Sequence, residues 1–212
     1  MTEHETLPVR LAQIAERADS LDPAVTRVSA IVRRLPKPLR DVLHGVPLGH
    51  PAHPIAILVP AGAWISAAML DVLPGGRRAA QTLVAAGIVT ATPAVATGLV
   101  DWSGLGREQQ RVGAVHAIAN TAALGLYTAS WLARRRGSHV GGAVLGFVGL
   151  AVVSASGYLG GHLTYRQGAG VTLDEPPRTD PLSEPTSRRA REPESDDLTG
   201  SAGGIEPTFM PS

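Results

Sequence analysis

The stretch Leu83-Val-Ala-Ala-Gly-Ile-Val-Thr-Ala-Thr-Pro-Ala-Val-Ala, residues 83–96, decides the fold class of this chain. It contains no charged residue, and its only polar side chains are two threonines. A helix of a soluble bundle shows a polar face at every turn, and this stretch shows none. The sequence therefore predicts a helix within a membrane rather than a helix of a soluble bundle.

This stretch belongs to one of four long blocks that lack Asp, Glu, Lys and Arg. A bilayer core needs about 20 apolar residues in a helix, and each block supplies that length. The blocks run over residues 42–70, 79–100, 112–133 and 137–165. We predict an all-α integral membrane four-helix bundle, with transmembrane helices at about 54–73, 79–101, 113–134 and 140–163.

Composition excludes several classes of function. A net charge of +1 gives no reason to expect nucleic acid as a partner. The absence of cysteine excludes disulfides, thiolate zinc sites, a cysteine nucleophile and any iron–sulfur cluster held by this chain alone. No apolar signal-peptide core precedes residue 41, so we expect no cleaved signal.

Three segments follow from these patterns. Residues 1–41 form a polar, amphipathic N-terminal segment, residues 42–171 the transmembrane domain, and residues 172–212 a disordered tail rich in Pro, Ser, Glu, Asp and Gly. In the first segment, Asp22 followed by a proline predicts a helix N-cap. One face of that helix is lined by Val25, Val28, Ile31, Val32 and Leu35. It lies either on the membrane surface or against the loops of the bundle.

Some residues in the domain are expected to have structural roles. Gly142 and Gly146 are four residues apart, as are Gly157 and Gly161, a spacing that lets helices approach closely. Pro60 and Pro93 are expected to kink the first and second predicted helices. The run Arg134–Arg136 is interpreted as an ordinary helix-end anchor.

The topology brings most histidines to one face of the membrane, which we call face A. Four crossings place both termini there, together with the start of the first and third helices and the end of the second and fourth. His139 alone falls on the opposite face, and His4 lies in the N-terminal segment. The residues expected at face A are His44, His50, His53, His116, His162 and Asp101.

Ionisable groups at membrane depth are costly, and they are therefore candidates for function. Neutral imidazole is also a common ligand of iron, copper and zinc. We predict cofactor binding by His53, His116 and His162 and metal ligation by His44, His50, His53, His116 and His162, with Asp101 and Asn120 orienting their rings. No catalytic residue is predicted. The alternatives are solvated loop histidines at His44 and His50 and a helix-capping role for Asp101.

Two functions of different class follow. The first is electron transfer by haem b, held between two histidines. If the helices pack in sequence order, the first and third lie diagonally, which makes His53 and His116 one axial pair; His116 and His162 are the other. The second is a non-redox membrane module, either a scaffold or a metal or proton site without catalysis.

Several short motifs, in order, resemble a bacterial family of predicted four-helix membrane proteins of unknown function. Some members carry a Rieske-type ferredoxin domain after the last helix. The resemblance implies the fold and the lipid bilayer as surroundings, and by association it implies redox work with a separate ferredoxin-type or quinone partner, since this chain lacks cluster ligands. The motifs are Leu43-His-Gly-Val-Pro-Leu-Gly-His-Pro-Ala-His-Pro, Pro60-Ala-Gly-Ala-Trp with Asp71, Thr97-Gly-Leu-Val-Asp-Trp, Val115-His with Asn120, and Gly157-Tyr-Leu-Gly-Gly-His-Leu-Thr-Tyr.

For localisation we predict the plasma membrane, with both termini on one side. A polar N-terminal segment without a signal peptide is awkward to translocate, which favours a cytoplasmic face A. Arg77, Arg78 and the run Arg134–Arg136 lie in short loops at the other face and favour the opposite orientation. Of the two, we predict cytoplasmic termini, because a ferredoxin domain fused to relatives would need cytoplasmic reductants.

Overall fold

The structure, a computed structural model, describes residues 6–170, and the predicted tail at 172–212 lies outside the described residues. Every regular element in the described part is helical, in agreement with the predicted all-α class. The helices are α1 (Leu7–Glu16), α2 (Asp22–Arg33), α3 (Lys37–His44), α4 (His53–Ala56), α5 (Leu58–Asp71), α6 (Arg77–Ser103), α7 (Arg107–Arg135) and α8 (His139–Tyr165), with 3-10 turns at Asp19–Leu21 and Val46–Leu48.

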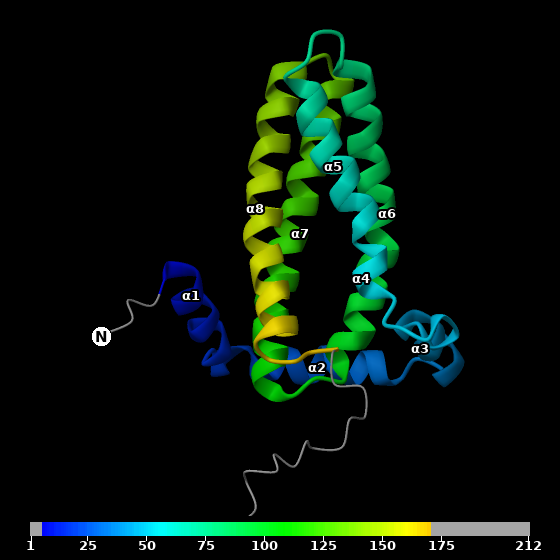
Figure 1. Ribbon diagram of the computed structural model, residues 1–212, viewed down its shortest axis with the longest axis vertical. Coiled ribbons are helices and arrows are strands. Elements are labelled where there is room, and N and C mark those ends of the chain that lie inside the picture. Colours follow the sequence, from blue (N-terminus) through cyan, green and yellow to red (C-terminus); the bar gives the residue numbers. More distant parts are fainter. Residues whose placement is uncertain (1–5, 171–212) are drawn as a thin grey trace, which may run out of the picture. The chain divides into compact units, whose positions relative to one another are not determined.

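The four long helices α5, α6, α7 and α8 pack side by side (Figure 1). Each contacts the next along the chain, and α8 returns to contact α5, so the helices form a ring in sequence order. In such a ring α5 lies diagonally across from α7, and α6 from α8. This is the order on which the pairing of His53 with His116 depends.

Within residues 6–170, three segments are long and apolar enough to cross a membrane: His53–Asp71, Arg77–Ser103 and His139–Tyr165. The fourth predicted crossing forms one continuous helix, α7, but its composition does not reach that level of hydropathy. The reason is local, because charged turns at both ends and polar side chains such as Asn120 lower the mean hydropathy of α7. The first segment is divided at Ile57, close to Pro60, whose missing N–H cannot bond the carbonyl four residues before it.

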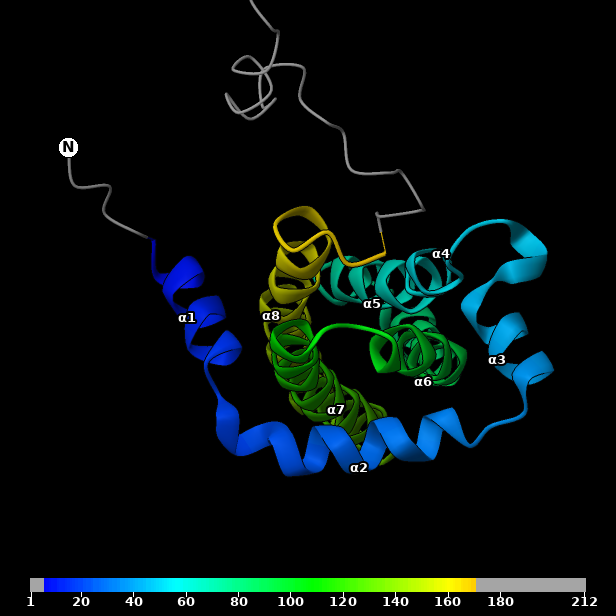
Figure 2. The same cartoon turned by 90° about the horizontal axis from the view of Figure 1, so that it is seen from below.

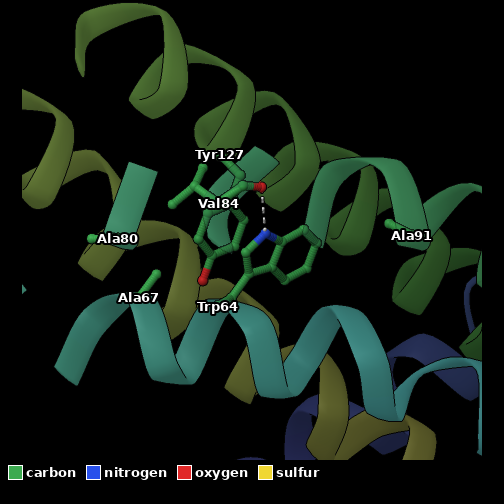
Figure 3. Packing of buried hydrophobic residues seen from close by; sticks show 6 residues of the cluster. All are labelled: Trp64, Ala67, Ala80, Val84, Ala91 and Tyr127. Atoms are coloured by element: carbon green, nitrogen blue, oxygen red, sulfur yellow. Dashed lines mark hydrogen bonds between the residues drawn. The ribbon is translucent and has the colours of Figure 1, made fainter. Parts of the chain in front are cut away.

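The main core lies between α5 and α7, where two aromatic rings stack (Figure 3). The ring centroids of Trp64 and Tyr127 are 4.0 Å apart and the planes differ by 8°. A glycine lies behind each ring: a Cβ at Gly87 would overlap the Trp64 indole, and one at Gly149 would come within 3.1 Å of the Tyr127 ring. The indole N–H donates to the Val84 carbonyl at 3.4 Å. Glycines on α6 and α8 thus make room for flat side chains from α5 and α7.

A buried ion pair joins the C-terminal ends of α5 and α7. Two guanidinium nitrogens of Arg134 each donate to one carboxylate oxygen of Asp71 at 2.6 Å, and the side chains are only 1% and 5% exposed. The Nε–H of Arg134 donates to Ser130 Oγ at 3.2 Å. A Cβ at Gly142 would overlap the stem of Arg134. The interpretation of Arg134 as an ordinary helix-end anchor is therefore wrong.

The glycine spacing on α8 is used unevenly. Gly142 and Gly146 face side chains of α7, as their spacing predicts. A Cβ at Gly157 would meet nothing within 4 Å, and one at Gly161 would meet only Tyr165 of the same helix. The second pair of glycines therefore makes no close approach to a neighbouring helix within the described residues.

Residues 6–44, which we call the collar, surround the end of the bundle that carries the α6–α7 turn (Figure 2). Val25, Ser29 and Val32 of α2 are buried, and Ser29 Oγ accepts a hydrogen bond from the Gln110 amide at 3.2 Å. The helix packs against the ends of α6 and α7, close to the second alternative, and its position on the membrane surface stays a prediction. The predicted hydrophobic face is only partly used, since Val28 and Ile31 are exposed.

Asp22 is the first residue of α2 rather than its N-cap, and its side chain caps no helix N–H. Its carboxylate instead accepts two hydrogen bonds from the Arg111 guanidinium, each at 2.8 Å. These bonds lower the pKa of Asp22 below its usual range, chiefly because they favour the charged carboxylate. The N-terminal prediction of an N-cap at this residue is wrong.

Candidate functional site

His53 stands at the first residue of α4, where the chain enters the bundle. A carbonyl can only accept, so the 2.9 Å contact between His53 Nδ1 and the Ala94 carbonyl requires the proton on Nδ1. The ring lies flat on α6 at Gly98, where a Cβ would approach the imidazole to 2.7 Å. The Oγ1 of Thr97 lies 3.5 Å from the same nitrogen. In the neutral ring this leaves the Nε2 lone pair without a partner among the described residues.

His116, in the third turn of α7, has a closely similar setting. Its Nδ1 donates to the Ser156 carbonyl at 2.8 Å. The ring lies on α8 at Gly160, where a Cβ would come within 3.2 Å of it. One feature differs, because the Asn120 amide donates to His116 Nε2 at 2.9 Å. Asn120 thus contacts His116, but through Nε2, and its role in orienting a ligating ring stays a prediction.

The two settings are equivalent because the bundle contains an internal repeat that the sequence reasoning missed. In each half the ring lies on a glycine, and the carbonyl that accepts from Nδ1 belongs to the residue four positions before that glycine. One half consists of α4, α5 and α6, and the other of α7 and α8. Three residues on α4 and α5 have counterparts on α7 that lie 63 positions later: His53 and His116, Trp64 and Tyr127, and Asp71 and Arg134. Three residues on α6 have counterparts on α8 that lie 62 positions later: Gly87 and Gly149, Ala94 and Ser156, and Gly98 and Gly160.

The ring of helices has the symmetry that such a repeat requires. Exchanging α5 with α7 and α6 with α8 leaves every helix contact in the ring in place. Both hairpins begin at the same end, so the pseudo-two-fold axis runs along the bundle. His53 and His116 are related by this axis.

The other predicted ligands are held separately. His44 Nδ1 lies 2.6 Å from Asp101 Oδ1, which joins α3 to α6. His162 is buried, and its Nε2 lies 2.8 Å from Glu16 Oε1 of α1, while its Nδ1 has no partner among the described residues. His50 is exposed. The predicted pairing of Asp101 with a histidine is therefore present, with His44 as the partner.

The arrangement does not support one metal centre built from five histidines. Within residues 6–170, no three of the His, Asp and Glu side chains come together as a possible metal ligand set. His162 is directed to the collar, and His44 to the end of α6. What remains as a candidate site is the pair His53 and His116.

The buried ion pair was the other feature that the sequence reasoning missed. Asp71 was named only within a motif of the resembled family, and Arg134 only as a helix-end anchor. The signal that would have found them is the repeat, because they occupy equivalent positions with opposite charges.

One of three comparisons with known proteins found a match. A family model described as predicted membrane protein, DUF2231, matches residues 49–173. No curated protein and no solved structure matches the chain. The matched range begins just before His53 and extends past the end of α8, so it includes both hairpins and the two histidines. The chain therefore belongs to the DUF2231 family of predicted membrane proteins.

Proposed function

We propose that this protein binds haem b between His53 and His116 in the membrane and transfers electrons through it. The observation that carries this proposal is the equivalent setting of the two imidazoles. In each, an Nδ1–H donates to a backbone carbonyl, which fixes the ring and presents Nε2 as the ligating nitrogen. Bundle cytochromes hold haem iron by histidines from facing helices. When bound, haem supplies one-electron chemistry.

The distribution of the core supports a cofactor at this depth. The buried apolar cluster that joins the two hairpins includes Trp64, Val84 and Tyr127, in the part of the bundle away from the histidines. At the histidine end the described residues form a second cluster, Ala15, Val112 and Leu163, which joins α1, α7 and α8 instead. A planar group held by both histidines would join the two halves of the bundle at this end.

Two details refine the ligand set. Coordination by His116 would require the Asn120 amide to release Nε2, to which it now donates. His162 is a weaker candidate, because Glu16 already binds its Nε2. The pair His53 and His116 is therefore favoured over the pair His116 and His162.

The proposal includes α7 as a fourth crossing. The helix has 29 residues and extends about 43 Å, which exceeds the roughly 30 Å of a bilayer core. Neighbours α6 and α8 cover it on two sides, which reduces the lipid-facing surface that must be apolar. Four crossings would place the collar and the end of α8 on the same side of the membrane. A separate ferredoxin-type protein or a quinone would exchange electrons with the haem.

The test is the haem content of the purified full-length protein after expression with added haem and iron. We expect a Soret band that sharpens on reduction with dithionite and is lost in both His53→Ala and His116→Ala. The double variant should bind no less than either single variant, because the two ligands form one site. His50→Ala, at an exposed position, is the matched control and should keep full occupancy.

A second expected result concerns the residue that competes with iron. Asn120→Ala should bind haem at least as tightly as the wild type, since it frees His116 Nε2. Full haem occupancy in both single histidine variants would refute the axial pair. A colourless wild type after these additions would favour the alternative, a scaffold or a proton or metal site.

A further inference from the structure

The helix α2 presents three different sectors around its axis. At about 100° per residue, Val25, Ser29 and Val32 form the inner sector, which is buried against the bundle. Val28 and Ile31 lie on one flank and are exposed. Arg27 and Arg34 lie on the outer sector, opposite the bundle, and are also exposed. The unusual feature is that one apolar flank of this amphipathic helix, with Val28 and Ile31, is left exposed beside the cationic sector.

Contacts with the bundle fix which flank is turned toward the membrane. Arg107 donates to Thr26 Oγ1 at 3.2 Å, and Arg33 donates to the Ser103 carbonyl at 3.5 Å. Both contacts are made to the α6–α7 turn, at the extreme end of the bundle. The flank that carries Thr26 and Arg33 therefore faces away from the middle of the bundle, and the opposite flank, with Val28 and Ile31, faces toward it.

The length of α6 places α2 at the depth of the lipid headgroups. This helix has 27 residues and is about 40 Å long, whereas the hydrocarbon core is about 30 Å thick. Arg77 and Arg78 begin the helix and mark the opposite surface. The last roughly 10 Å of α6, which α2 contacts, must then lie in the headgroup region.

The charges of the collar are unbalanced. Residues 6–44 contain seven Arg and Lys residues and four Asp and Glu residues. All four carboxylates already have partners, namely His162 and Gln167 for Glu16, Arg111 for Asp19 and Asp22, and Lys37 for Asp41. By contrast, the side chains of four arginines have no hydrogen-bond or ion-pair partner among the described residues: Arg10, Arg17, Arg27 and Arg34.

We propose that the collar is a docking surface for anionic phospholipid. The flank with Val28 and Ile31 inserts beneath the headgroups, and Arg27 and Arg34 on the outer sector bind their phosphates. Anionic lipid around the histidine end of the bundle would then hold α2 against the α6–α7 turn. This inference does not depend on the proposed haem site.

The depth of the two flanks is tested in nanodiscs with brominated acyl chains, using the full-length protein. The chain has no cysteine, so a single introduced cysteine labels at one position. A fluorophore at Ile31→Cys should be strongly quenched by the brominated lipid, and one at Thr26→Cys, on the opposite flank, should not. Equal quenching at the two positions would overturn the assignment of the flanks.

The headgroup preference is tested by thermal unfolding of the purified protein in zwitterionic micelles. Added phosphatidylglycerol should raise the Tm by roughly 2–4 °C, and phosphatidylcholine should not. The double variant R27Q/R34Q should lose this response, while R77Q/R78Q, with the same loss of charge at the opposite end, should keep it. An equal response to both lipids, or to inorganic phosphate alone, would overturn the proposal, as would an undiminished response in R27Q/R34Q.

Discussion

The buried pair of Asp71 and Arg134 makes a quantitative prediction about stability. Asp71→Ala leaves a guanidinium that is 1% exposed with two of its hydrogen bonds unmade. Breaking a buried pair by removing one partner costs about 3–5 kcal/mol, because the remaining charge is uncompensated. We expect each of Asp71→Ala and Arg134→Ala to lower the free energy of unfolding by that amount.

The double variant separates the pair from its individual side chains. Removing both partners leaves no buried charge, so the double variant should be no less stable than either single variant, which corresponds to a coupling energy of about 3 kcal/mol or more. The free energy is measured by equilibrium unfolding of the full-length protein in mixed micelles. Arg136→Ala is the matched control, and we expect a change within about 0.5 kcal/mol because Arg136 is exposed.

The reasoning would be refuted by additivity. If the double variant loses the sum of the two single effects, the residues do not act as a pair. If each single variant loses less than about 1 kcal/mol, the typical value for an exposed pair, the ion pair is not buried as described.

Two further predictions follow from individual residues. Tyr127→Phe should leave stability unchanged or raise it by about 1 kcal/mol, because the buried Tyr127 hydroxyl has no hydrogen-bond partner in the described part of the chain; a clear loss in the same unfolding assay would contradict this. The lowered pKa of Asp22 means that its bonds to Arg111 stabilise the protein above its unfolded pKa of about 3.9 and that this contribution disappears as pH falls through the lower folded value. The free energies of unfolding of the wild type and Asp22→Asn should therefore converge below about pH 4. A difference that stays constant with pH would contradict the lowered pKa of Asp22.

The helices themselves were accessible from the sequence. The predictions at 79–101 and 140–163 correspond to α6 at Arg77–Ser103 and α8 at His139–Tyr165, within a few residues at each end. Such blocks form helices because a membrane satisfies no backbone hydrogen bonds from outside, which is a local constraint. The prediction for the collar helix also identified its apolar residues, but not which of them face the bundle.

The candidate site was accessible only in part. The topology brought His44, His53 and His116 toward one end of the bundle, but it did not separate them into different contacts. His44 pairs with Asp101, and His53 donates to the Ala94 carbonyl. These partners are distant in sequence, and the rotation of each helix about its own axis selects them.

The sequence by itself determined the extent and order of the long helices and the end at which the histidines gather, because hydropathy and chain direction are local properties. Only the tertiary structure decided which polar groups meet. Arg134 finds Asp71 rather than a lipid phosphate because Gly142 lets its stem lie against α8. His53 and His116 share one geometry because Gly98 and Gly160 lie at equivalent depths in two repeated hairpins. Helix rotation and close contact depend on glycines and flat rings from different helices fitting together, and no single stretch of sequence contains that information.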